Sequence, residues 1–121
     1  MAFFQKNLSY NSIITILDDN YPLKLKQLYH LPLVLFYQGE LTLLKRPFLA
    51  IVGTRQCSYY SEEILHQILP AIVRHQIVTI SGLAQGIDSL CHRLTITGQR
   101  DTIGVIGNGL DVFLPLIKNY K

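Results

Sequence analysis

The sequence is poor in cysteine, the residue that most often marks disulfide frameworks and zinc sites. Two of its 121 residues are cysteines, Cys57 and Cys91, and they do not form a CxxC pair. So few cysteines argue against both a disulfide framework and a zinc site. We expect both thiols to be reduced and partly buried, and we expect no metal ion or other cofactor.

Long apolar runs are also absent. The longest candidate, Leu31 to Tyr37, has about the length of a strand and falls well short of the roughly 18 residues that span a bilayer. The N-terminus lacks the basic start, apolar centre and cleavage site of a signal peptide. These absences predict a cytoplasmic protein without a membrane partner.

Concentrated positive charge is missing as well. The net charge is +3, but the lysines and arginines are scattered and form no run of four. This balance suits a polyanionic partner and equally an ordinary, slightly basic surface. Evidence for nucleic-acid binding must therefore come from a local site. The chain length and the hydrophobic content of 49% fit one globular domain.

What the sequence does contain is a strand–turn–helix alternation that begins at residue 48. Apolar runs at residues 48–52, 77–80 and 102–106 have the length and composition of strands. The first run is almost entirely apolar, which is typical of a parallel strand that is covered on both faces. The alternation predicts an α/β fold with a Rossmann-like parallel sheet, truncated at about three βα units.

Two helices are expected to connect these strands. The first should start near Ser58 or Ser61, and Pro70 predicts a kink or a break into two short helices near residues 66–70. The second should end at Gly98. Each helix has an apolar stripe that is expected to face the core, formed by Ile64, Leu65, Ile68, Leu69 and Ile72 in the first and by Ile87, Leu90, Cys91 and Leu94 in the second.

Residues 1–47 are expected to form an N-terminal lead-in that packs on the partial Rossmann-like domain of residues 48–121. Residues 1–12 show no periodicity and predict a loose segment. A short helix with Pro22 at its first position follows, and then a buried strand at residues 33–37. This strand could pair at one edge of the sheet, which leaves the other edge for self-association.

Each strand of the expected parallel sheet ends in a turn that contains glycine. The three turns read Gly53-Thr54-Arg55, Ser81-Gly82-Leu83-Ala84-Gln85-Gly86-Ile87-Asp88 and Gly107-Asn108-Gly109-Leu110-Asp111. Glycine lets a phosphate approach the unpaired backbone N–H groups at a helix N-terminus. Because the carboxyl ends of parallel strands share one sheet edge, the turns are expected to line one crevice, where we predict the functional site.

These turns, in this order and at this spacing, resemble those of the DNA-processing protein A (DprA/Smf) family. That family has a glycine-hydroxyl-arginine turn, an SGxAxGID turn followed by a histidine, here His92, and a GxGxD turn. The segments Ile16 to Pro22 and Leu33 to Gly39 also look like the family's lead into its first Rossmann strand. The resemblance covers roughly residues 13–117.

The resemblance implies a protein without catalytic residues that binds single-stranded DNA and helps to load the RecA recombinase onto it, chiefly during natural transformation. Arg55 is then expected to contact a DNA phosphate, because a guanidinium can grip phosphate bidentately. The plainer alternative for Arg55 is a solvated side chain or a local salt bridge. The expected DNA-binding residues are Gly53, Thr54, Arg55, Ser81, Gly82, Gln85, Gly86, Gly107, Asn108 and Gly109, and Asp88, His92 and Asp111 are expected to be structural at the site.

The sequence departs from the family pattern in four places. Gln85 stands where some members carry a basic residue, Leu114-Pro115 replaces a tyrosine-proline pair, and Lys118 replaces an asparagine. The family also continues into a second half of its sheet, with surfaces implicated in dimerisation and in contact with the recombinase. A homodimer and a retained recombinase contact therefore stay open for this chain.

Several residues of the crevice have structural interpretations beside the functional ones. We interpret Asp88 as an acceptor of backbone N–H bonds and His92 as its hydrogen-bond partner, not as a metal ligand. Cys57 invites a nucleophile hypothesis, but no base stands at a spacing that supports it. Tyr59 and Tyr60 could equally stack on bases or be partly buried against the sheet edge.

Two further function classes stay open. A Rossmann-like sheet also carries nucleotide-processing enzymes, such as the lysine decarboxylase-like phosphoribohydrolases, whose PGGxGTxxE signature is missing here. The third interpretation is a folded but inactive remnant.

Overall fold

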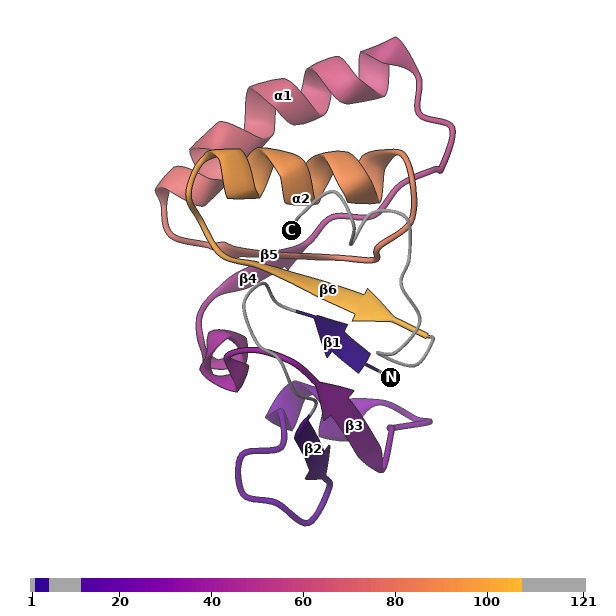
Figure 1. Cartoon of the computed structure of the whole chain (residues 1–121), viewed down its shortest axis with the longest axis vertical. Coiled ribbons are helices and arrows are strands. Elements are labelled where there is room, and N and C mark those ends of the chain that lie inside the picture. The colour runs from indigo at the N-terminus through magenta and orange to yellow at the C-terminus, as the bar shows by residue number, and fades with distance from the viewer. Residues whose placement is uncertain (1, 5–11, 108–121) are drawn as a thin grey trace.

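One six-stranded mixed sheet organises the chain (Figure 1). The computed structural model describes residues 2–4 and 12–107. The strands lie in the order β2-β3-β1-β6-β5-β4, and β4, β5 and β6 are mutually parallel. The predicted α/β, Rossmann-like parallel unit is thereby confirmed. The strand bounds are β1 Ala2–Phe4, β2 Ser12–Thr15, β3 Val34–Tyr37, β4 Phe48–Ala50, β5 Val78–Ser81 and β6 Thr102–Ile106.

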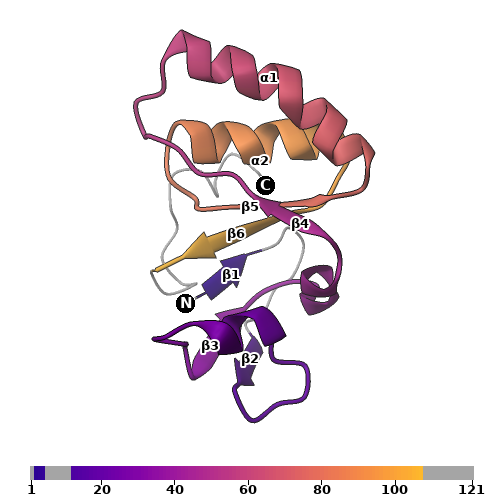
Figure 2. The same ribbon diagram turned by 180° about the vertical axis from the view of Figure 1, so that it is seen from behind.

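Two helices form a layer on one side of the parallel strands. Helix α1 (Tyr59–Arg74) connects β4 to β5, and helix α2 (Ile87–Thr97) connects β5 to β6. Figures 1 and 2 show both helices on the same side of β4, β5 and β6. Their shared core consists of Leu65, Leu69, Val73, Ile87, Leu90 and Cys91. No helix within residues 2–4 and 12–107 is long and apolar enough to cross a membrane.

Helix α1 begins where the sequence predicts and then continues past its proline. Ser58 is the N-cap, and its hydroxyl accepts a hydrogen bond from the Ser61 amide over 3.2 Å. Of the predicted kink or break near Pro70, the break is wrong, because α1 is one helix of 16 residues with Pro70 inside it. Proline removes a single backbone hydrogen bond, whereas the buried side chains of Leu69 and Val73 on either side hold the helix to α2.

Two predictions of burial, one for the core-facing stripe of α1 and one for β4, are wrong in part. Ile64 and Ile68 of the expected core stripe of α1 are 36% and 47% exposed. Leu49 in β4, the strand expected to be covered on both faces, is 43% exposed. For Leu49 the reason is the position of β4, which is the last strand of the sheet and has β5 as its one neighbour among the described residues. β4 is therefore less buried among the described residues than its apolar composition predicts.

The N-terminal segment contributes to the sheet in a way that the sequence did not predict. Residues 1–12 were expected to be loose, but β1 pairs antiparallel with β6 and parallel with β3. A strand fits there because the edge of β6 otherwise presents unpaired backbone groups. The expected boundary between residues 47 and 48 stays a prediction, since strands from both sides of it share one sheet.

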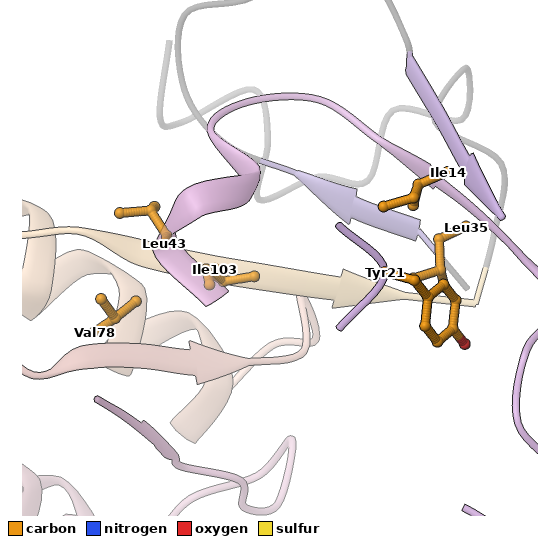
Figure 3. Packing of buried hydrophobic residues seen from close by; sticks show 6 residues of the cluster. All are labelled: Ile14, Tyr21, Leu35, Leu43, Val78 and Ile103. Atoms are coloured by element: carbon orange, nitrogen blue, oxygen red, sulfur yellow. The ribbon is translucent and has the colours of Figure 1, made fainter. Parts of the chain in front are cut away.

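A second core lies between the N-terminal segment and the parallel strands. Leu35 of β3 is fully buried while Phe36 is 47% exposed, so the strand that was predicted to be buried alternates between buried and exposed residues. The short 3₁₀ helices η1 (Leu23–Gln27) and η2 (Leu41–Lys45) pack nearby, and Pro22 caps η1 instead of starting it. Figure 3 shows the buried members of this core, Ile14, Tyr21, Leu35, Leu43, Val78 and Ile103.

Candidate functional site

The first two glycine turns leave the sheet side by side at the carboxyl ends of β4 and β5. The two strands pair in parallel with Ala50 opposite Ile80. Beyond the last pair, the amide of Ile51 donates a hydrogen bond to the carbonyl of Ile80 over 2.8 Å. The turns at residues 53–55 and 82–86 are therefore neighbours, as expected for successive parallel strands.

The third turn starts at the end of β6, on the far side of β5 from β4. Gly107 is exposed, and a side chain there would meet open space. The predicted site residues Asn108, Gly109 and Asp111 lie outside the described residues. Their place in the crevice stays a prediction.

The first two turns are in direct backbone contact with each other. The amide of Ile87, the first residue of α2, donates to the carbonyl of Thr54 over 3.2 Å. The amide of Gly53 donates to Asp88 Oδ1 over 3.3 Å. Gly86 adopts a φ of 82°, and a Cβ atom built on it would come within 2.2 Å of the Thr54 carbonyl oxygen. The two turns thus form one packed unit.

Ser81 has an internal partner. Its hydroxyl donates to the carbonyl of Ile51, and its side chain is 2% exposed. This hydrogen bond ties the end of β5 to the end of β4. Among the predicted ligands on the two described turns, the exposed ones are Gly53, Thr54, Arg55 and Gln85, while Gly82 and Gly86 are half-buried.

Arg55 is the one cation on this packed unit and extends from an exposed position. Within residues 2–4 and 12–107, the structure gives its guanidinium no hydrogen-bond or ion-pair partner. By contrast, Arg46 forms a salt bridge with Asp101 over 2.6 Å. Thr54, next to Arg55, donates its hydroxyl to the carbonyl of Gln56 over 2.7 Å, which closes the turn locally. The guanidinium is consequently available to an anionic ligand.

His92 forms a hydrogen bond with the second turn. Its Nε2 lies 2.6 Å from the carbonyl oxygen of Gly82, and its Nδ1 lies 2.8 Å from Thr102 Oγ1. Because a carbonyl can only accept, Nε2 carries the proton. The ring is thus not held by the predicted hydrogen bond to Asp88. Burial lowers the pKa of His92, while the Gly82 carbonyl and the charge of Asp88 oppose that shift.

The sequence reasoning missed a network of buried and half-buried threonine hydroxyl groups that joins the strands to α2. Thr79 Oγ1 lies 2.9 Å from Thr95 Oγ1 and donates to Thr102 Oγ1 over 2.7 Å. Thr102 also contacts His92, so the network joins β5, β6 and α2. The available signal was the presence of threonines within otherwise apolar segments. Among the described residues, no group of three His, Cys, Asp or Glu side chains could hold a metal ion.

The two cysteines have different surroundings, and both are free thiols. The Cys57 thiol donates to Glu62 Oε1 over 3.3 Å, and this hydrogen bond raises the pKa of Cys57. Burial raises the pKa of Cys91 to about 11. Both thiols are therefore protonated at neutral pH, which disfavours the nucleophile hypothesis for Cys57. Arg93, exposed on α2, lowers the Cys57 pKa slightly and is a nearby cation that the sequence reasoning missed.

Tyr59 and Tyr60 lie in the first turn of α1, a few residues after Arg55. Their side chains are 78% and 72% exposed. The predicted alternative of partial burial against the sheet edge is therefore wrong. Both rings are accessible to solvent.

The fold and the turns define a Rossmann-like α/β protein whose candidate site lies at the carboxyl ends of parallel strands. Comparison with known families identifies it further. The family model described as DNA recombination-mediator protein A matches residues 12–120. The chain belongs to this family.

Its relatives are considerably longer than the chain itself. The DNA processing protein DprA of Streptococcus pneumoniae is 43% identical over 112 residues, which are 93% of this chain and 38% of the relative. DprA of Bacillus subtilis is 40% identical over 84% of this chain and 35% of the relative, and protein Smf of Escherichia coli is 35% identical over 81% and 26%. The X-ray structure of the pneumococcal DprA matches with a TM-score of 0.82 and 40% identity, over 90% of this chain and 40% of that one.

Proposed function

We propose that this chain binds single-stranded DNA as part of a recombination mediator that assists the loading of RecA during DNA uptake in natural transformation. The observation that carries the proposal is the exposed guanidinium of Arg55, which has no partner among the described residues. Arg55 belongs to the first of two glycine turns that are hydrogen-bonded to each other. Membership of the recombination-mediator family supports it. We propose binding and not catalysis, in a protein without a cofactor.

The proposed contact combines a phosphate with its neighbouring base. Arg55 would hold a phosphate oxygen pair through two parallel N–H bonds, a geometry that suits guanidinium. Tyr59 and Tyr60, both largely exposed, would offer aromatic faces to the adjacent bases. Stacking tolerates every base, so binding would show little sequence preference. Arg93 would add a second positive charge near the same turn.

The decisive experiment is fluorescence anisotropy of a labelled oligo-dT strand titrated with the chain at several salt concentrations. We expect Arg55→Ala to weaken binding by about tenfold and to reduce the salt slope by about one charge. Arg74→Ala is the matched control, because Arg74 is an exposed arginine at the opposite end of α1. Equal affinities of Arg55→Ala and the wild-type chain would refute the proposed site.

We also propose self-association through the open side of β4. Exposed apolar side chains lie in and just after this strand, where Leu49 is 43% and Val52 76% exposed. A strand edge with apolar neighbours is a surface that favours pairing with a second copy. Sedimentation analysis at micromolar concentration tests this, and a strictly monomeric profile that Leu49→Lys leaves unchanged would contradict it.

The recombinase contact requires its own assay, because the chain spans 38% of the pneumococcal relative. We propose that the chain shortens the lag before RecA begins DNA-dependent ATP hydrolysis on oligo-dT. Arg55→Ala should abolish that effect if it depends on DNA binding. An unchanged lag with saturating wild-type chain would count against recombinase loading by this part of the protein.

A further inference from the structure

We propose that Asp88 and Gly86 are positioning residues that hold the Arg55 turn in its binding geometry, and that the N-terminus of α2 is not itself a phosphate site. This inference rests on the proposed function. It assigns the glycine-rich second turn a different role from the one its sequence indicates. The second turn shapes the first turn, and the side chains of the first turn contact the DNA.

The carboxylate of Asp88 lies against Gly53 and Gly82, two of the glycines that the sequence predicts to leave room for a phosphate. Its Oδ1 accepts the amide proton of Gly53 at 3.3 Å, and a Cβ atom on Gly82 would come within 2.5 Å of its Oδ2. The carboxylate therefore fits between the two turns and is 8% exposed. A negative charge in this position repels a second anion and stabilises the N-terminus of α2.

Two backbone donors of the junction are already used inside the protein. The Ile87 amide donates to the Thr54 carbonyl, and the Gly53 amide donates to Asp88. An anion that bound the Ile87 and Gly53 amides would have to displace both partners. The same bonds fix the backbone on which the Arg55 side chain stands.

Gly86 is required for this arrangement by its conformation and by its close packing. Its φ of 82° belongs to a region that L side chains rarely adopt. A Cβ atom there would approach the carbonyl oxygens of Thr54 and Arg55 to 2.2 Å and 2.6 Å. These neighbours are backbone atoms, so any side chain at position 86 would push the Arg55 turn away.

A double-mutant cycle tests the proposal through binding of labelled oligo-dT. Asp88→Ala should weaken binding about as much as Arg55→Ala, about tenfold, and should cause no further loss in the Arg55→Ala background. Asp88→Asn keeps an acceptor for the Gly53 amide and should bind at least as well as the wild-type chain. Glu63→Ala is the control for the loss of one negative charge and should not weaken binding, because Glu63 is exposed on α1.

Hydrogen exchange provides a readout that does not depend on DNA. Asp88→Ala should accelerate amide exchange selectively at residues 53–56, and Gly86→Ala should do the same. If Asp88→Ala does not fold, Asp88→Glu takes its place, because it keeps the charge and displaces the acceptor.

Three outcomes would overturn the proposal: additive losses in the cycle, tighter binding by Asp88→Ala, or unchanged exchange at residues 53–56. If Arg55→Ala alone leaves binding unchanged, the proposed function fails, while the exchange experiment still decides whether Asp88 positions the turn.

Discussion

Lowering the pH through the ordinary range of histidine should destabilise this fold through His92. His92 is 2% exposed. Its imidazole is hydrogen-bonded to Gly82 and Thr102 and interacts electrostatically with Asp88. Burial lowers its pKa below the ordinary value of 6.5. In the unfolded chain the same imidazole titrates normally. Below its ordinary pKa the unfolded state therefore binds a proton that the folded state does not take up.

The sign and the size of the effect follow from proton linkage. Because the unfolded state binds more protons below its pKa, the free energy of unfolding falls as the pH falls. One proton contributes at most about 1.4 kcal/mol per pH unit, so a change from about pH 7.5 to about pH 5.5 should remove up to about 1.4 kcal/mol. The loss levels off once the pH passes below the folded-state pKa of His92.

Urea unfolding at a series of pH values measures this contribution, with His92→Gln as the reference. The glutamine amide can still donate to the Gly82 carbonyl, but it does not titrate. The variant should lose the part of the pH dependence that belongs to His92, while the other histidines and the carboxylates contribute equally to both proteins. Parallel pH profiles for the two proteins would refute the assignment of a neutral, buried His92.

Four further substitutions, at positions 58, 68 and 69, test the packing and the start of α1. Leu69→Ala should lower the free energy of unfolding by about 2–5 kcal/mol, because Leu69 is fully buried between the helices. Ile68→Ala should lower it by less than about 1 kcal/mol, because Ile68 is 47% exposed. Ser58→Ala should cost about 1 kcal/mol through loss of the N-cap, and Ser58→Asp should restore most of it. Urea unfolding measures the free energy of unfolding of each variant. Equal losses of stability at positions 68 and 69 would contradict the packing of α1, and unchanged stability of Ser58→Ala would contradict the N-cap.

Local signals in the sequence were sufficient for the parallel part of the fold. β5, β6 and the two helices lie close to their predicted positions, because each combines an apolar pattern with a cap or a turn. Ser58 and Gly98, the predicted N-cap and C-cap, occupy those positions. Such features depend on a few neighbouring residues and can therefore be predicted without the tertiary structure.

The failures concern contacts between distant segments. Nothing in Ala2–Phe4 indicates a strand, and its place is determined by the free edge of β6, about a hundred residues later. Pro70 costs the helix one hydrogen bond locally, but the local penalty is outweighed by packing against α2. In the same way, the exposure of β4 depends on which strands are present beside it and not on its own composition.

The candidate site illustrates why a glycine pattern alone does not define a ligand. The sequence indicated that Gly53, Gly82 and Gly86 leave room for a phosphate. In the structure, the space beside Gly53 is taken by Ile87, the space beside Gly82 by Asp88, and the space beside Gly86 by backbone of the first turn. The absent side chains therefore allow two turns to pack against each other, and a sequence cannot distinguish this from close approach of a ligand. The affinity for an anion then depends on the side chain that this packing leaves exposed, which is Arg55.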